Sequence, residues 1–495
     1  MCLPALALRS RVDISMSRLA TLSIVVLCWA AIYLPGLGSL EIKGEEGRRI
    51  LPAVTMVETG NWLVPQVGSE PYFRKPPLVN WLVALSFKLT GLRNEWTARL
   101  PSALSVLAVA LAFIVVGRAS LGANGSLIAA LVWLVNFGMI EKGRLIEIEA
   151  LYVSLFGLGL VCWLSWWWQR RSAWLIWIVP SIFLGLGVLA KGPVHLLFFY
   201  AVVVAVLHRA GELRKLRHPA HFAGMLIVFG IFAAWAIPYW QAMPEGNLAR
   251  TWSIQLTGRF TGDDFKLGNW LLNIPRGLAY FLPWTLLLPF VRGAVLPTSR
   301  ETNLLRALTW GGAVPFLVVN LLPGALPRYS MPALVPATWL MAMTLSASEI
   351  RSPAWWRALQ IPPAGRRLRL VVSMAVVAGT ALCLYAAAVV PALQRRSKVK
   401  PIAEQIDALV PKSESLYAVD PDYQPFLFYI RSRLVYVSRA DDLPLSARYI
   451  LVQPEKERAV TESERWAPLH ARRLFTVTDY RKRTVILLKV SEGDP

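Results

Sequence analysis

The chain has 495 residues, of which 55% are hydrophobic and 17% are charged, and its formal net charge at pH 7 is +22. This composition excludes a soluble protein of this size and is typical of a membrane protein. The basic residues are scattered between apolar runs, so they indicate the positive-inside bias of a membrane protein and no nucleic-acid partner. The four cysteines, Cys2, Cys28, Cys162 and Cys383, lack the spacing of metal ligands and are expected to be free thiols.

Apolar runs along the first 390 residues predict an all-α polytopic membrane domain with about 11 to 13 transmembrane helices. Arg9, Arg11 and Arg18 precede the first run, 19–38, so we expect a cytoplasmic N-terminus and a first span that the mature protein keeps. The stretch 39–96 then lies outside and includes a helix at 78–90 on the membrane surface. Further spans are expected at 98–117, 125–140, 150–168, 173–190, 193–207, 222–240, 270–291, 304–322, 330–346 and 370–391.

Residues 392–495 differ in kind, because charged residues become frequent there. A helical pattern at 401–410 precedes strand-like runs at 415–419, 434–438, 449–452 and 484–490. We therefore expect two domains, a membrane domain over 1–391 and a small soluble α/β domain over 392–495. The alternation of spans places the second domain outside the cell membrane, while every loop expected inside is basic.

Charged residues collect at the outer ends of the expected spans and in the outer loops. A charge within a span costs roughly 2.5–3.5 kcal/mol, so charges at span ends tend to face a cavity lined by protein. A mixed acidic and basic cluster suits a phosphate, held by the cations, and a hydroxyl, on which a carboxylate acts. The cluster comprises Glu45, Glu46, Arg48, Lys75, Glu147, Glu149, Lys191, Arg259 and Arg328.

Simpler interpretations exist for the acidic members and for Lys75. In the simpler interpretation, Glu45 and Glu46 are solvent-exposed residues in the first turn of a helix, since acidic residues favour helix N-termini. In the simpler interpretation, Lys75 is a membrane anchor whose ammonium group extends to the membrane surface. Pro76 and Pro77, which follow it, argue against this because they fix a rigid turn. Glu147 and Glu149 diverge by about 200° on a helix, so at most one of them is expected to face a cavity.

The other polar residues also allow simpler interpretations. Arg259 and Arg328 are compatible with two roles, anchoring the chain next to the membrane and binding substrate. His195 begins an expected span without a partner at metal spacing, so we interpret it as a polar interface residue.

Several motifs follow one another in a fixed order between about residues 30 and 345. They are Glu41-Ile-Lys-Gly-Glu45-Glu46-Gly-Arg48-Arg49, Gly60-Asn61-Trp62, Tyr72-Phe73-Arg74-Lys75-Pro76-Pro77, Asn94-Glu95-Trp96-Thr97-Ala98-Arg99-Leu100-Pro101, Lys191-Gly192-Pro193, Gly258-Arg259-Phe260, Leu282-Pro283-Trp284 and Leu326-Pro327-Arg328-Tyr329. The run resembles the GT-C glycosyltransferases related to protein O-mannosyltransferases and to the aminoarabinose transferases that modify lipid A. The C-terminal hundred residues contribute no motif to this resemblance.

The resemblance implies a multi-pass protein of the bacterial inner membrane with a periplasmic C-terminal domain. It also implies a polyprenyl-phosphate sugar donor and an extracytoplasmic acceptor, either lipid A, another envelope glycan or a protein. Glu45 takes the position of the family's catalytic Asp, and Glu149 takes that of a second Asp. Substrate binding is implied for Glu46, Arg48, Lys75, Lys191, Arg259 and Arg328, with Lys75 holding the donor phosphate.

The sequence departs from the family pattern, because both aspartates are glutamates here and Arg49 stands where Tyr is usual. A non-catalytic relative therefore remains an alternative, as does a lipid or glycan transporter or flippase. Transporters tend to carry charges at mid-membrane and repeated halves, and neither is visible in this sequence. No cofactor motif is evident, and no divalent metal is indicated.

Overall fold

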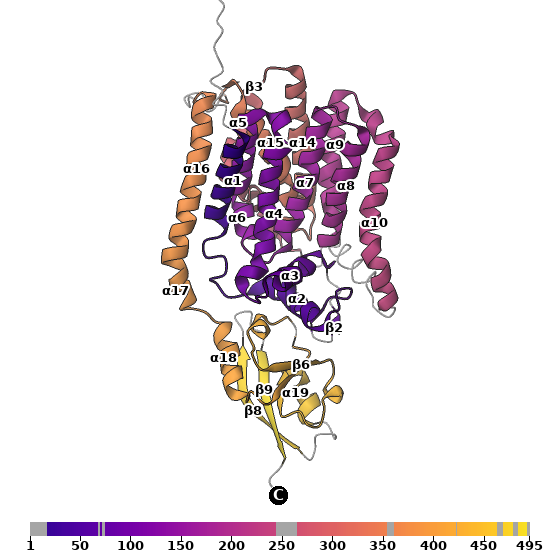
Figure 1. Ribbon diagram of the computed structural model, residues 1–495, viewed down its shortest axis with the longest axis vertical. Coiled ribbons are helices and arrows are strands. Elements are labelled where there is room, and N and C mark those ends of the chain that lie inside the picture. The colour runs from indigo at the N-terminus through magenta and orange to yellow at the C-terminus, as the bar shows by residue number, and fades with distance from the viewer. Residues whose placement is uncertain are drawn as a thin grey trace, which may run out of the picture.

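The computed structural model describes residues 17–67, 70–71, 75–243, 265–353, 361–421, 423–462, 469–478 and 484–492. Most of them form a helical bundle, and a five-stranded sheet lies beyond one end of it (Figure 1). The upright helices are α1 (Arg18–Tyr33), α4 (Glu95–Val115), α5 (Arg118–Val135), α7 (Ile148–Trp168), α8 (Ala173–Ala190), α9 (Val194–Ala210), α10 (Pro219–Ala242), α14 (Ser299–Leu321), α15 (Leu334–Ser346) and α16 (Ala364–Leu384), which continues through a π-helical turn (Tyr385–Val389) into α17 (Val390–Gln394). Within these described ranges, seven helices are long and apolar enough to cross a membrane, or eight if one bent pair counts as a span. The chain is therefore a multi-pass membrane protein.

Helix α7 forms the centre of the bundle. In its most apolar stretch 94% of the residues are buried, compared with 28% for α10 and 17% for α16. A helix that is apolar on all sides belongs in the interior, whereas α10 and α16 stand at opposite edges of the bundle and expose apolar side chains (Figure 1). The first turn of α7 carries Glu149, so this residue begins the most enclosed helix.

Two expected spans are not continuous helices. The prediction for 125–140 is wrong, because Asn136 has an extended backbone that ends α5, and its side chain accepts a hydrogen bond from the Met139 amide to start α6 (Phe137–Gly143). The segment expected as a straight span at 270–291 is instead broken. That segment forms α12 (Leu267–Leu271), α13 (Asn273–Ala279) and η3 (Trp284–Gly293), with a 90° bend between α13 and η3. Pro283 lies at the bend, where proline removes an amide donor from any continuing helix.

The segment 39–96 lies between the bundle and the sheet (Figure 1). It contains η1 (Gly44–Glu46), α2 (Gly47–Thr59), the two-residue strands β1 (Gln66–Val67) and β2 (Glu70–Pro71), and α3 (Leu78–Thr90). The helix expected at 78–90 is confirmed. Gly60 and Gly91 adopt left-handed backbone angles that end α2 and α3, and Asn94 caps α4 by accepting a hydrogen bond from the Thr97 amide.

The sheet has the strand order β6-β5-β7-β9-β8. Strand β5 pairs in parallel with β6 and β7, whereas β9 is antiparallel to β7 and β8. The elements are α18 (Lys400–Leu409), β5 (Ser415–Val419), η7 (Pro425–Phe428), β6 (Arg433–Val437), η8 (Ala440–Asp442), β7 (Tyr449–Val452), α19 (Pro454–Thr461), β8 (Leu469–Thr478) and β9 (Thr484–Glu492). The four expected strands are present, and β8 is an edge strand that the sequence pattern missed.

The remaining elements are short connections: η2 (Leu213–Arg217), η4 (Pro327–Ala333) and the paired strands β3 (Ala294–Val295) and β4 (Glu349–Ile350). Of these, η4 brings Arg328 to 3.3 Å from the Glu149 carboxylate at the start of α7.

Candidate active site

Glu149 is the centre of a buried ion cluster. Its side chain is 8% exposed and accepts a hydrogen bond from the Lys191 ammonium at 3.2 Å, while the Arg328 guanidinium lies 3.3 Å away. Lys191 ends α8 and Arg328 lies on η4, so three elements meet at one carboxylate. Among these three side chains the cations outnumber the carboxylate by one, which suits an anionic ligand.

Aromatic rings complete the surroundings of Lys191. Its ammonium lies 5.1 Å from the centroid of the Tyr152 ring and 4.9 Å from that of Tyr329. Ring faces attract cations, most strongly where water is excluded. The rings therefore help to keep a charged lysine at the buried end of α8.

Glu45 lies on η1 and is partly exposed. Its carboxylate accepts hydrogen bonds from one nitrogen of Arg48, at 2.9 Å and 3.1 Å. Burial alone lowers the pKa of Arg328, but the carboxylates of Glu149, Glu147 and Glu45 offset this and raise it. The charge of Glu45 therefore acts on Arg328, although its hydrogen-bond partner is Arg48.

Glu46 has a different place from its neighbour. It is 2% exposed, and Arg99 of α4 donates to both carboxylate oxygens, at 2.8 Å and 2.9 Å. One oxygen also accepts a hydrogen bond from the Ile146 amide at 3.1 Å. Arg99 further donates to the carbonyls of Leu37 and Leu40. This geometry differs from the expected substrate-binding role, because the carboxylate is used to join η1, α4 and the segment before α7.

Glu147 and Glu149 have different partners, but the reason is not the predicted helical divergence, because Glu147 has an extended backbone and precedes α7. Glu147 pairs with Lys142 of α6 at 3.0 Å, and Lys142 also contacts Glu141 at 2.9 Å. Burial raises the pKa of the Glu147 carboxyl. A second charge cluster thus lies beside the first, and it has more carboxylates than cations.

Lys75 lies in the turn that leads into α3 and is partly buried, with Pro76 and Pro77 buried behind it. Nearby, the Asn80 amide donates to the Arg49 carbonyl at 2.8 Å and so fixes the start of α3 against α2. Arg259 lies outside the described residues.

His195 is fully buried. Its ring nitrogens lie 3.2 Å from the Tyr152 hydroxyl and 2.9 Å from the Leu184 carbonyl, so the ring joins α9 to α7 and α8. Across the part of the chain that the structure describes, no group of three or more His, Cys, Asp and Glu side chains is placed to hold a metal ion.

An apolar groove of about 720 Å³ runs beside the cluster. Residues of α13, η3, α14, η4 and α15 line it, including Phe281, Leu308, Phe316 and Leu334. Its lining also includes Ser330, two residues from Arg328, and the arginines Arg292 and Arg351. A long apolar chain would fit such a groove.

Sequence reasoning missed Arg99, Lys142 and the two tyrosines around Lys191. Arg99 and Tyr329 lie inside motifs that the sequence shows, and their membership of those motifs could have identified them as site residues. Lys142 and Tyr152 belong to no motif. Their roles depend on which helices pack together.

Comparisons with known proteins show which families and folds the chain resembles. Residues 74–238 match the family model of dolichyl-phosphate-mannose-protein mannosyltransferases. The chain is 27% identical over 299 residues to the undecaprenyl phosphate-alpha-4-amino-4-deoxy-L-arabinose arabinosyl transferase of Pseudomonas savastanoi, covering 59% of this chain and 54% of that protein. It is 26% identical over 343 residues to the enzyme of the same name from Pseudomonas aeruginosa, covering 67% and 60%. The chain thus spans a little over half the length of these relatives.

The crystal structure of ArnT from Cupriavidus metallidurans bound to undecaprenyl phosphate has a TM-score of 0.69 to this structure at 18% identity, covering 96% of this chain and 99% of that one. The fold is therefore shared along nearly the whole chain, including the sheet. The chain has the GT-C fold and is related to the aminoarabinose transferases and the protein O-mannosyltransferases.

Proposed function

We propose that this protein is an integral membrane glycosyltransferase that moves a sugar from a polyprenyl phosphate to an extracytoplasmic acceptor. The observation that carries the proposal is the buried Glu149 between the cations Lys191 and Arg328, together with an apolar groove whose lining includes Ser330, two residues from Arg328. A phosphate attached to a long apolar chain matches both features. The names of the relatives, which include undecaprenyl phosphate and dolichyl phosphate, support the same donor class.

In the proposed reaction, an acceptor oxygen forms a bond to the anomeric carbon while the bond from that carbon to the phosphate oxygen breaks. The polyprenyl phosphate leaves with the bonding electron pair, so its negative charge grows in the transition state. Lys191 and Arg328 would stabilise that charge, together with Lys75 and Arg259. A hydroxyl acceptor would lose its proton to Glu45, whereas an anionic phosphate acceptor would need no base.

The other charged residues act by position in this proposal. Arg48 orients the Glu45 carboxylate through the 2.9 Å contact. Glu149 keeps Lys191 and Arg328 together, and Glu46 anchors the loop through Arg99. Acceptor alignment is then a matter of geometry, which contributes strongly to rates of group transfer.

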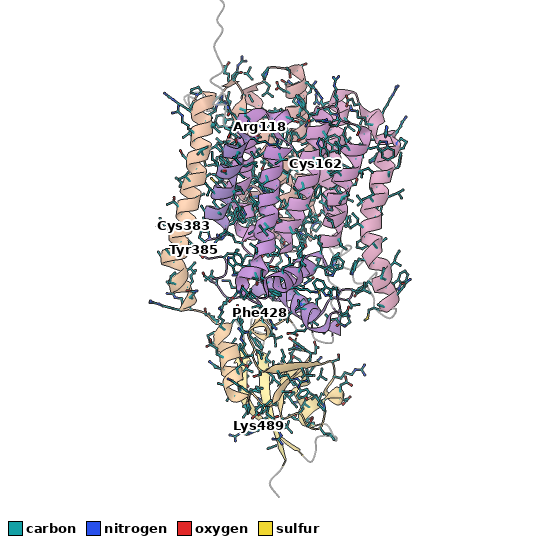
Figure 2. The ribbon with its side chains drawn as sticks, viewed as in Figure 1. Arg118, Cys162, Cys383, Tyr385, Phe428 and Lys489 are labelled. Atoms are coloured by element: carbon teal, nitrogen blue, oxygen red, sulfur yellow. The ribbon has the colours of Figure 1, made fainter. Side chains whose placement is uncertain are left out.

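We further propose a cytoplasmic N-terminus and a periplasmic domain over 392–495, joined to a membrane domain over 1–391. Basic residues at the end of the bundle away from the sheet support this orientation. There Arg300 lies over Trp168 and donates to its carbonyl, and Trp167 donates to Glu212 of the basic loop at η2. Arg118 lies at this end and Lys489 lies in the sheet (Figure 2). The proposed 11 spans are the seven long apolar helices, the bent pair and the shorter helices α1, α9 and α15, with the apolar helix α3 on the membrane surface.

A transfer assay tests the proposal. Purified protein in liposomes would receive labelled polyprenyl-phosphate sugars and extracted envelope glycolipids, other envelope glycans or proteins as acceptors. We expect labelled product with the wild-type chain, and its loss in Glu45→Gln but not in Glu404→Gln, which changes an exposed carboxylate on α18. Lipid movement across the bilayer without product would support a flippase, and equal transfer by Glu45→Gln would remove Glu45 from the mechanism.

A further inference from the structure

The C-terminal domain is tied to the segment that carries Glu45. The carboxylate of Glu41 accepts hydrogen bonds from the backbone amides of Lys398, Val399 and Lys400, at 3.0 Å, 2.8 Å and 3.1 Å. These amides begin α18, where the helix dipole favours a negative charge. The loop at residue 41 therefore supplies the acceptor for the first amides of the C-terminal domain.

A second tie runs through Tyr429, which follows η7. Its hydroxyl accepts a hydrogen bond from the Ile42 amide at 2.6 Å and donates to the Glu95 carboxylate at 3.0 Å. Lys400 of α18 pairs with the same carboxylate at 2.7 Å. Phe428 lies next to this network at the junction of the bundle and the sheet, 6.4 Å from the Phe87 ring of α3 (Figure 2). Residue 42 and the start of α4 are thus held by one tyrosine of the C-terminal domain.

The third contact lies directly beside Glu45. A Cβ atom on Gly47 would lie 2.9 Å from the Tyr423 carbonyl oxygen, so the two backbones approach too closely for a side chain. The Arg48 guanidinium lies 5.8 Å from the centroid of the Tyr423 ring, and the same guanidinium holds the Glu45 carboxylate. The segment at Tyr423 therefore packs against the two residues that follow Glu46.

We infer that the C-terminal domain is a positioning element of the active site, in which Glu41, Tyr429 and Tyr423 fix the loop 41–48 and so the carboxylate of Glu45. The inference rests on the proposed function of Glu45. Of the cations expected to hold the donor phosphate, Lys191 and Arg328 come from the bundle, and Lys75 lies in the turn before α3, outside the loop 41–48. Loosening the ties should therefore lower kcat and leave the KM for the donor nearly unchanged.

The test compares Tyr429→Phe with Tyr417→Phe in the full-length protein. Tyr429→Phe keeps the ring and removes the two hydroxyl bonds, whereas Tyr417 lies on β5 and packs against the sheet's own core. Hydrogen exchange measured by mass spectrometry would report on peptides covering residues 38–48, and the liposome assay would give kcat and the KM for the donor. We expect faster exchange in this segment and a fall in kcat of about tenfold or more for Tyr429→Phe, because small misplacements of a reacting group cost about that much or more.

Gly47→Ala is a second variant with the same expected signature, since its methyl group would push against the Tyr423 carbonyl. An unchanged exchange rate, or an unchanged kcat with wild-type transfer intact, would overturn the inference while leaving the proposed function standing. A rise in donor KM equal to the fall in kcat/KM, with kcat unchanged, would also overturn it. Absence of transfer by the wild-type chain would instead count against the proposed function, and the inference would fall with it.

Discussion

The Lys191 ammonium donates a hydrogen bond to the Glu149 carboxylate at 3.2 Å, although 42 residues separate them in sequence. Glu149 lies in the first turn of α7, and Lys191 follows the last turn of α8. The bond forms because these antiparallel helices pack side by side, so that the start of α7 lies next to the end of α8. Arg328 approaches the same carboxylate from η4. Glu149 is thus the counter-charge of the buried Lys191 and of the partly exposed Arg328.

Glu149→Gln should damage both stability and activity. The amide is neutral, so Lys191 and Arg328 would share a buried site without their carboxylate. Removing one partner of a buried ion pair costs about 3–5 kcal/mol, and the loss of ordered cations should slow transfer by at least about 100-fold. Thermal unfolding in detergent and the liposome assay measure the two effects. Equal melting temperatures for Glu149→Gln and Glu404→Gln would contradict this account of the cluster.

Arg99→Lys should be more harmful than a change of the same type at Arg93. Arg99 makes a two-bond contact with Glu46 and donates to backbone carbonyls in a site that is 3% exposed, and lysine lacks the planar fork for these bonds. Arg93 pairs with Glu58 at the surface, where such pairs contribute about 0–1 kcal/mol. We expect a loss of about 3 kcal/mol in unfolding free energy for Arg99→Lys. A denaturation series on both variants checks the difference, and similar midpoints would be the contrary result.

Glu45→Asp tests whether the longer carboxylate is required here. The substitution keeps the charge but withdraws it by about 1.5 Å, which would break the 2.9 Å contact with Arg48. We expect kcat to fall by about 10- to 100-fold, since a misplacement of about 1 Å costs this much in group transfer. Steady-state kinetics with saturating donor provide the measurement. A kcat equal to that of the wild type would mean that the surrounding site adapts to either length.

The groove between α14 and α15 should discriminate donors by chain length. Ala337→Trp would fill part of its volume, whereas Val314→Trp places the same side chain on α14 at a residue that does not line the groove. We expect the KM for a long polyprenyl donor to rise about tenfold in Ala337→Trp, while a donor with two isoprene units is used as before. Competition between donors of different length gives the ratio. An equal loss with both donors would argue against polyprenyl binding in this groove.

The sequence was most informative where one local signal decides the structure. The α3 helix lies at 78–90 as expected, and strands appear at the short runs rich in apolar residues, as at 415–419 and 449–452. The cost of placing charge in lipid was enough to collect Glu45, Glu149, Lys191 and Arg328 at one end of the bundle.

Pairing within the site could not be predicted in the same way. Glu45 and Glu46 are adjacent and chemically identical, yet one is partly exposed beside Arg48 and the other is buried against Arg99. Their difference depends on how η1 meets α4, which a single sequence does not encode locally. The break at Asn136 and the bend at Pro283 likewise lie inside apolar runs whose composition suits continuous spans.

The central claim, that the site holds a polyprenyl-phosphate sugar, is tested most directly by native mass spectrometry of protein purified gently from its own membranes. Lys75→Ala and Lys88→Ala form a matched pair, because Lys75 precedes α3 and Lys88 lies exposed in its last turn. We predict a bound polyprenyl-phosphate sugar in the wild type and in Lys88→Ala, with loss of at least 90%, or about tenfold in affinity, in Lys75→Ala. Detection of bulk phospholipid alone, even after polyprenyl-phosphate sugars are added, would contradict the claim.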